Sequence, residues 1–202
     1  MDFFELILNR ESVRSYDPHR PVESDKIQKI LKAGHLAPSA ANRQPWRFYL
    51  VSTPEYLDKV RDCYHKSWFK KAPHLLLVTG KKDLAWTRSS DGFNSLEMDI
   101  AIAMDHMILQ AESLGVSTCW IVAFDTEKLH QLGIVEEGEV VYACLLYTSD
   151  AADDPLCVDL GGRRIIKTTT YHIRTESCMH STYTYASGHR DCPACNLTRV
   201  IM

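Results

Sequence analysis

The sequence has no long hydrophobic run and no strong excess of charge of either sign. None of its apolar stretches approaches the roughly 18 residues that a membrane-spanning helix needs. The formal net charge is −3, so no overall field attracts nucleic acid or an anionic membrane surface. The first residues, Met1 to Glu5, lack the basic segment that begins a secretory signal. These absences predict a soluble, cytoplasmic protein that binds neither nucleic acid nor membrane.

Cysteine is scarce before residue 144 and frequent after it. Only Cys63 and Cys119 belong to the first part, and the others follow at Cys144, Cys157, Cys178, Cys192 and Cys195. Two separate cysteines suit a reduced cytosolic enzyme without a disulfide framework. The cysteine-rich remainder is a different kind of sequence.

Four histidines of the first part show neither the spacing of metal ligands nor a nucleophile beside them in sequence: His35, His65, His74 and His106. The chain likewise shows no catalytic triad and no paired carboxylates. We therefore assign no catalytic residue and no metal ligand.

Up to residue 143, hydrophobic periodicity predicts one coherent domain of helices and strands. Helices are predicted near residues 3–7, over 24–34, from 53 onward, over 94–114 and over 125–132. Strands are predicted over residues 46–51, 74–79 and 118–122, and from 139 onward. The longest helix carries one apolar stripe and is closed by Gly115.

Two short stretches indicate cofactor chemistry. Residues 10–14 read Arg-Glu-Ser-Val-Arg, and residues 38–46 read Pro-Ser-Ala-Ala-Asn-Arg-Gln-Pro-Trp. Each places small or hydrogen-bonding residues beside a cation or an aromatic ring. A planar, phosphorylated cofactor needs this mixture, because arginine binds phosphate oxygens and short polar side chains bind the edge of a heterocycle.

Together these stretches resemble the nitroreductase family of flavoproteins, whose patterns read R-x-S-x-R and A-P-S-x-x-N-x-Q-P-W. The resemblance runs from about residue 3 to residue 143 and includes residues 68–73, 99–104 and 114–121. It implies an α+β fold with a central, mostly antiparallel sheet flanked by helices. It also implies a homodimer with FMN at the subunit interface, which passes hydride from NADH or NADPH to a small acceptor such as a nitroaromatic or a quinone.

Two alternatives stay open for the function. A flavin carrier or sensor, or an enzyme that consumes the flavin itself, needs the same binding residues as a reductase. Because the flavin N5 is the reactive atom in hydride transfer, the missing acid and nucleophile do not argue against an enzyme.

The resemblance assigns the first stretch to the polar parts of FMN. Arg10 and Ser12 match positions near the phosphate and the ribityl chain, and Arg14 matches one near the pyrimidine end of the ring. A fixed cation there favours the negative charge of a reduced flavin and raises its reduction potential. In the alternative interpretation, both arginines pair on the surface with nearby acids, which are Glu5, Glu11 and Asp17.

The resemblance assigns two further groups to the ring itself. A loop from the neighbouring subunit supplies Pro38, Ser39, Ala40 and Asn42, and a strand end supplies Trp120, Ile121 and Val122, largely through its main chain. Gln44 is expected to hold the loop, and Trp46 to anchor the core. The resemblance includes Gly at positions 117 and 122 in many relatives, so the valine at 122 is expected to narrow the pocket or to alter which acceptor fits.

After residue 143 the sequence changes character. Residues 144–153 and 157–167 resemble the in-frame translation of a sequencing adapter, and residues 155 and 156 fall at its variable index. We therefore predict an incomplete FMN-binding domain over residues 1–143, cut within its last strand, and a non-native, disordered tail over residues 144–202.

The tail contains thiol and imidazole groups of the kind that bind zinc, at Cys178, His180, His189, Cys192 and Cys195. One C-x-x-C pair with loosely spaced histidines is weak evidence, so no metal site is assigned. The resemblance also implies that the family's C-terminal segment, which embraces the partner subunit and adds a basic residue near the phosphate, is missing. This chain is therefore expected to bind FMN poorly or to misfold.

Overall fold

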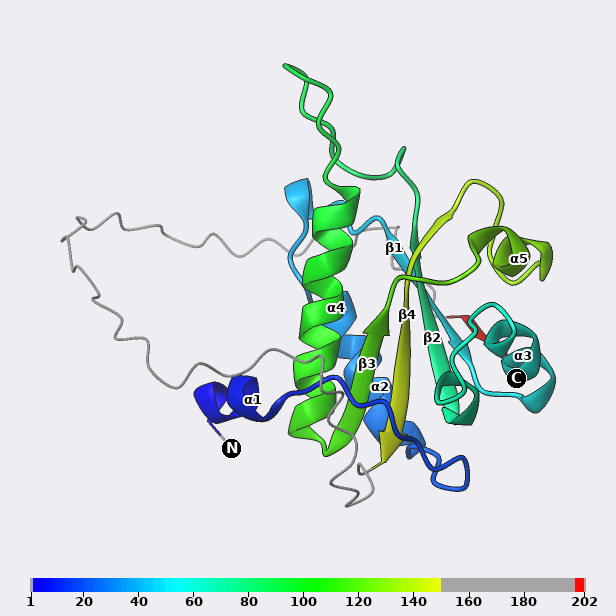
Figure 1. Cartoon of the computed structure of the whole chain (residues 1–202). Coiled ribbons are helices and arrows are strands. Elements are labelled where there is room, and N and C mark those ends of the chain that lie inside the picture. Colours follow the sequence, from blue (N-terminus) through cyan, green and yellow to red (C-terminus); the bar gives the residue numbers. More distant parts are fainter. Residues whose placement is uncertain (1, 150–198, 202) are drawn as a thin grey trace. The chain divides into compact units, whose positions relative to one another are not determined.

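The computed structural model describes residues 2–149 and 199–201 of the chain (Figure 1). Its helices are α1 (Phe3–Asn9), α2 (Ser24–His35), α3 (Pro54–Arg61), α4 (Leu96–Ser113) and α5 (Thr126–Gln131), with short 3-10 turns η1 (Ala40–Asn42) and η2 (Phe69–Lys71). Its strands are β1 (Trp46–Val51), β2 (His74–Gly80), β3 (Val116–Ile121), β4 (Val140–Ser149) and β5 (Arg199–Ile201).

The five strands form one sheet in the order β3-β4-β2-β1-β5. The pairs β1–β2, β2–β4 and β3–β4 are antiparallel, and β5 lies parallel to β1. The predicted α+β class, with a mostly antiparallel sheet flanked by helices, is confirmed.

The core lies on both faces of this sheet, and alternate residues of β1 pack on opposite faces. Phe48 and Leu50 pack with α2 and α4 on one face, whereas Tyr49 and Val51 pack with α3 and η2 on the other. This alternation is the side-chain period of a strand, and both halves are buried because helices cover both faces. Figure 1 shows α4 beside β3 on one side of the sheet and α3 and α5 on the other.

Helix α4 is the element that positions the candidate site. Its buried stripe includes Ile100, Met104 and Met107, and Gly115 ends it with a φ of 69°. Helix α2 approaches it closely at Gly34, where an added Cβ would lie 2.8 Å from the sulfur of Met107. A side chain at that position would therefore push the two helices apart.

Strand β4 continues past the predicted domain boundary at residue 143. Residues 144–149, expected to belong to a disordered tail, form the second half of β4 and pair with both β2 and β3. Residues 199–201 likewise form β5 along the edge of β1. Neighbouring strands present unpaired backbone groups at both places, and these groups bind an extended segment whatever its origin. Residues 150–198, with the zinc candidates and most of the adapter-like sequence, lie outside the described residues.

A buried polar cluster ties the loop before β4 to the sheet. Glu139 accepts hydrogen bonds from the hydroxyls of Tyr49 at 2.8 Å and Thr79 at 2.9 Å, and Arg47 lies 3.1 Å from its other oxygen. Burial and the bond to Glu139 raise the pKa of Tyr49 to about 12. Two hydroxyl donors therefore satisfy one oxygen of the carboxylate, and the Arg47 charge compensates the other, which accepts no hydrogen bond from the described residues.

Candidate functional site

The first predicted stretch lies along β3. Ser12 forms a parallel bridge with Thr118, and the amide of Val13 donates to the Thr118 carbonyl at 3.0 Å. Because side chains alternate along an extended segment, Val13 is buried in the core while Ser12 and Arg14 stay exposed. The sheet thus holds residues 10–14 rigidly and leaves their polar side chains accessible. In Figure 1 this segment leads away from α1 and passes β3.

The two arginines of this stretch lie close to the same strand. Burial raises the pKa of the Cys119 thiol, and the charges of Arg14 and Arg10 oppose that rise. Burial also raises the pKa of Glu112, near the end of α4, and Arg10 again opposes the rise. Both cations therefore lie near Cys119 of β3, and two positive charges beside one strand favour the binding of an anion.

The alternative interpretation of the arginines, surface pairing, is wrong. Glu5 instead completes a capping box with Asp2, and Asp17 accepts from the amide of His19. Within residues 2–149, neither the Arg10 nor the Arg14 guanidinium makes a hydrogen bond or a close ion pair. Their donors are available to a ligand.

The end of β3 adds partly exposed apolar groups. Trp120 is 39% exposed and Val122, just beyond the strand, is 65% exposed, while Ile121 between them is buried. Cys119 is buried, as expected for a small mid-strand hydrophobe. Val122 therefore presents its side chain at the surface.

The second predicted stretch forms a tight loop around η1. Ser39 Oγ accepts from the amide of Gln44 at 2.9 Å, and Gln44 Nε2 donates to the carbonyl of His35 at 3.3 Å. Trp46 is fully buried and stacks on Phe48. The structural roles expected for Gln44 and Trp46 are confirmed. The predicted ligand residues of this loop are partly or fully exposed: Pro38, Ser39, Ala40 and Asn42.

Sequence reasoning missed the residue that holds this loop in place. The Ala40 amide donates to Oδ1 of Asp99 at 2.9 Å, and Asp99 is fully buried in the first part of α4. Its signal was visible, because an acid stands beside Ile100 within the apolar stripe of the helix.

In one copy of the chain the two stretches stay apart. The loop is bound to Asp99 near the start of α4, whereas Arg10 acts on Glu112 near its end. At 1.5 Å per residue, these helix positions are separated by about 20 Å. Figure 1 shows the turn after α2 and helix α1 at opposite ends of α4.

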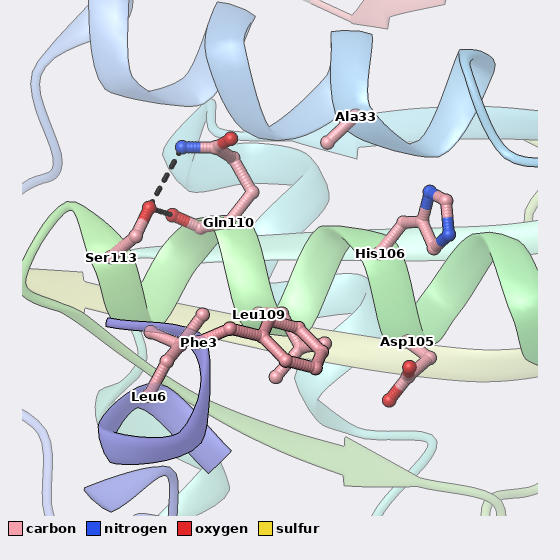
Figure 2. Close-up of a pocket in the computed structure, with 8 residues that line it drawn as sticks. All are labelled: Phe3, Leu6, Ala33, Asp105, His106, Leu109, Gln110 and Ser113. Carbon is pink, nitrogen blue, oxygen red and sulfur yellow. Dashed lines mark hydrogen bonds between the residues drawn. The ribbon is translucent and has the colours of Figure 1, made fainter. Parts of the chain in front are cut away.

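A separate pocket of about 420 Å³ lies between α1, α2 and α4. Figure 2 shows Phe3 and Leu6 of α1 facing α4, with the polar side chains of Asp105 and His106 further along the helix. None of the predicted flavin residues lines it. Helix α1 has no buried residue, and its large apolar side chains are exposed: Phe3, Phe4, Ile7 and Leu8.

Comparison with known proteins decides the family. A model of the nitroreductase family matches residues 7–71 and 58–146, most of the chain before the adapter-like sequence. The chain belongs to the nitroreductase family.

Relatives and solved structures agree with this assignment. A protein of Archaeoglobus fulgidus named as an NADH dehydrogenase/NAD(P)H nitroreductase is 30% identical over 156 residues, which cover 74% of this chain and 87% of that protein. The crystal structure of a nitroreductase family protein from Clostridium difficile 630 matches with a TM-score of 0.70 and 32% identity, covering 75% of this chain and 86% of the other. An FMN-dependent nitroreductase from C. difficile R20291 matches with a TM-score of 0.64 and 26% identity, covering 75% and 90%.

The protein is therefore a nitroreductase-family enzyme, an oxidoreductase. In the part of the chain that the structure describes, no three His, Cys, Asp or Glu residues gather as a metal site. Nor does any helix in that part have the length and apolar character that crossing a membrane requires.

Proposed function

We propose that this protein is an FMN-dependent oxidoreductase that transfers hydride from NADH or NADPH, through the flavin, to a small acceptor such as a nitroaromatic or a quinone. The observation that carries the proposal is the pair of guanidinium groups, Arg10 and Arg14, held with Ser12 beside β3 and paired with no described residue. The FMN-dependent nitroreductase of C. difficile, matched at 26% identity, supports the choice of cofactor.

The residues of the segment beside β3 fit the chemistry of FMN. A guanidinium presents a planar fork of donors that matches two phosphate oxygens, and Arg10 would bind the phosphate in this way with Ser12 on the ribityl chain. Arg14 would face the pyrimidine end of the ring and stabilise negative charge there. When bound, FMN supplies the hydride-accepting centre, and the protein orients it and limits access of water.

The ring face would come from a second copy of the chain. Because the loop of residues 38–42 lies about 20 Å along α4 from Arg10, one copy does not hold a single ring with both stretches. We therefore propose a homodimer in which Pro38, Ser39, Ala40 and Asn42 of one subunit meet the β3 site of the other, including Trp120, Ile121 and Val122. Burial of the exposed apolar side chains of α1 would favour association.

The test is a flavin titration combined with steady-state kinetics. Purified full-length chain is titrated with FMN and followed by flavin fluorescence, its mass is measured with and without FMN, and NADH or NADPH oxidation is recorded with nitro and quinone acceptors. Because this chain is expected to bind FMN poorly, the titration extends to millimolar FMN, where we expect binding by a dimer and acceptor-dependent oxidation. Because one relative of 27% identity is named an iodotyrosine deiodinase, an iodinated phenol belongs in the acceptor set.

Each outcome separates the candidate functions. Failure to bind FMN at millimolar concentration contradicts the cofactor assignment. Binding without oxidation of either nucleotide by any acceptor contradicts the reductase and favours a flavin carrier or sensor.

We further propose that the FMN-binding domain is encoded by the sequence up to residue 143, that residues 144–167 derive from adapter DNA, and that the whole of residues 144–202 is non-native. Residues 144–149 pair through their backbone with β2 and β3, and backbone pairing is nearly independent of side-chain identity. Sequencing of the genomic locus tests this. An intact reading frame that encodes residues 144–202 in the source genome would contradict the proposal.

A further inference from the structure

The side chain of Asp99 connects two elements that are distant in sequence. It is fully buried, its Oδ1 accepts from the Ala40 amide at 2.9 Å, and its Oδ2 accepts from the Ser95 hydroxyl at 2.7 Å. Ser95 is itself fully buried and lies immediately before α4. One carboxylate therefore joins the loop of residues 38–44 to the start of the central helix.

The loop that Asp99 holds has an unfavourable backbone. Ala41, Asn42 and Gln44 adopt φ values of 51°, 53° and 47°, a left-handed conformation that costs each L-residue about 1–2 kcal/mol relative to the right-handed one. Such a conformation persists only where the surroundings impose it. Within the loop, Ser39 accepts from the amides of Asn42 and Gln44. These local bonds fix the turn, and the bond from Ala40 to Asp99 fixes where the turn lies on the fold.

A buried carboxylate is itself costly, so its presence requires an explanation. Asp99 occupies the fourth position of α4, where the partial positive charge of the helix start favours an anion. An apolar side chain would fill the same stripe beside Ile100 and Ala103 without any desolvation cost. What an apolar side chain does not provide is an acceptor for the Ala40 amide, which would then lack its partner.

We propose that Asp99 is the positioning residue for the flavin-binding loop, holding residues 38–42 in the strained shape in which their backbone meets the ring. This inference rests on the proposed function. It adds that the affinity for flavin depends on a side chain inside the protein that does not touch the flavin. Preorganisation of this kind improves binding because the loop loses little freedom when the ligand arrives.

Three substitutions in the full-length chain test the role. Asp99→Ala removes both acceptors. Asp99→Asn keeps an oxygen for the Ala40 amide, and its NH₂ group donates to the Ser95 hydroxyl. Thr79→Val serves as the matched control, because it removes one hydrogen bond to buried Glu139 and none of the hydrogen bonds that hold the loop. Two readouts are used, the Kd for FMN by fluorescence titration and the rate of trypsin cleavage after the exposed Arg43.

We expect Asp99→Ala to weaken FMN binding about tenfold or more and to accelerate cleavage after Arg43 by a similar factor. Asp99→Asn should restore both values to within about threefold of the unaltered chain. Thr79→Val should lower Tm without changing either readout. Equal FMN affinity in Asp99→Ala and the unaltered chain, or equal weakening by Thr79→Val, would overturn the proposal.

A second variant keeps the test decisive if Asp99→Ala does not fold. Ser95→Ala leaves the carboxylate on the Ala40 amide and removes the hydroxyl that orients it, so about threefold weakening is expected. Unchanged affinity and unchanged cleavage in Ser95→Ala would then contradict the role. If the unaltered chain binds no FMN, the proposed function fails and the flavin role of Asp99 fails with it. The trypsin assay still decides separately whether Asp99 orders the loop.

Discussion

The two halves of the candidate site are built in opposite ways. Residues 10–14 extend along β3 in a relaxed backbone conformation and present charge, with Val13 as their buried anchor. Residues 38–44 form a tight turn in which three residues have left-handed backbone conformations. A carboxylate from α4 holds this turn in position. The position of residues 10–14 therefore depends on backbone pairing with a neighbouring strand, whereas the position of residues 38–44 depends on one side chain that is distant in sequence.

The largest expected effect comes from removing charge from the first half. Arg10→Ala should weaken FMN binding about 10- to 100-fold, because one charge-assisted contact contributes about 1.5–3 kcal/mol. The Tm should change little, since this guanidinium makes no close ion pair within the described fold. The measurement is an FMN titration beside a thermal melt.

Lys59→Ala is the matched control for Arg10→Ala, because it removes one cation from exposed α3 on the other side of the sheet. It should leave FMN affinity unchanged. A similar loss in both variants would mean that net charge alone attracts the ligand.

Breaking the anchor of the first half should cost stability. Val13→Ala removes two buried methyl groups from the second face of the core, and we expect a loss of about 2 kcal/mol in the free energy of unfolding. Urea denaturation measures it. Val122→Ala is the control at an exposed position nearby, and it should change the free energy by less than about 0.5 kcal/mol.

Relieving backbone strain in residues 38–44 should instead raise the free energy of unfolding. Ala41 has a φ of 51°, a conformation that glycine adopts without penalty. Ala41→Gly should therefore raise the free energy of unfolding by up to about 1 kcal/mol. The gain is reduced by the greater freedom of glycine in the unfolded chain. Ala33→Gly in α2, where the backbone is helical, should instead lose about 1 kcal/mol in the same urea measurement. Destabilisation by Ala41→Gly would show that the turn is not strained.

The smallest expected effect is a loss of stability at acidic pH, which acts through the contact of His74 with the segment that follows Arg14. His74 Nε2 accepts from the amide of Val22 at 3.1 Å, and Nδ1 lies 3.0 Å from the Ser52 hydroxyl, so the bound imidazole is neutral. Burial lowers the pKa of His74 below its usual 6.5. The unfolded chain therefore takes up this proton first as the pH falls, and stability present above about pH 6.5 is lost below it.

Thermal melts between pH 7.5 and 5.5 check this effect. His74→Gln keeps polar atoms at the position without the titration, so its Tm should fall less on acidification than that of the unaltered chain. An equal fall in both proteins would assign the pH dependence to other groups, such as half-buried His35, whose pKa burial also lowers.

Much of the fold was predictable because its elements follow local rules. β1 was predicted over the same residues that the structure shows, and Gly115 ends α4 as expected. Asp125 caps α5 through the Lys128 amide. The end of β4 was not predictable, because strand pairing continues wherever two neighbours offer hydrogen bonds, and adapter-like sequence satisfies that need as well as native sequence.

The sequence by itself determined the chemistry that this protein offers, which is two arginines and a serine on one segment and a proline-serine turn on another, inside a family domain. Only the tertiary structure decided where these groups lie, with the arginines beside β3, the turn about 20 Å away along α4, and Asp99 behind it. The physical reason is range. Periodicity and capping act over a few residues, whereas the bond from Ala40 to Asp99 joins residues 59 positions apart. The local sequence indicates this bond only by one acid in an apolar stripe.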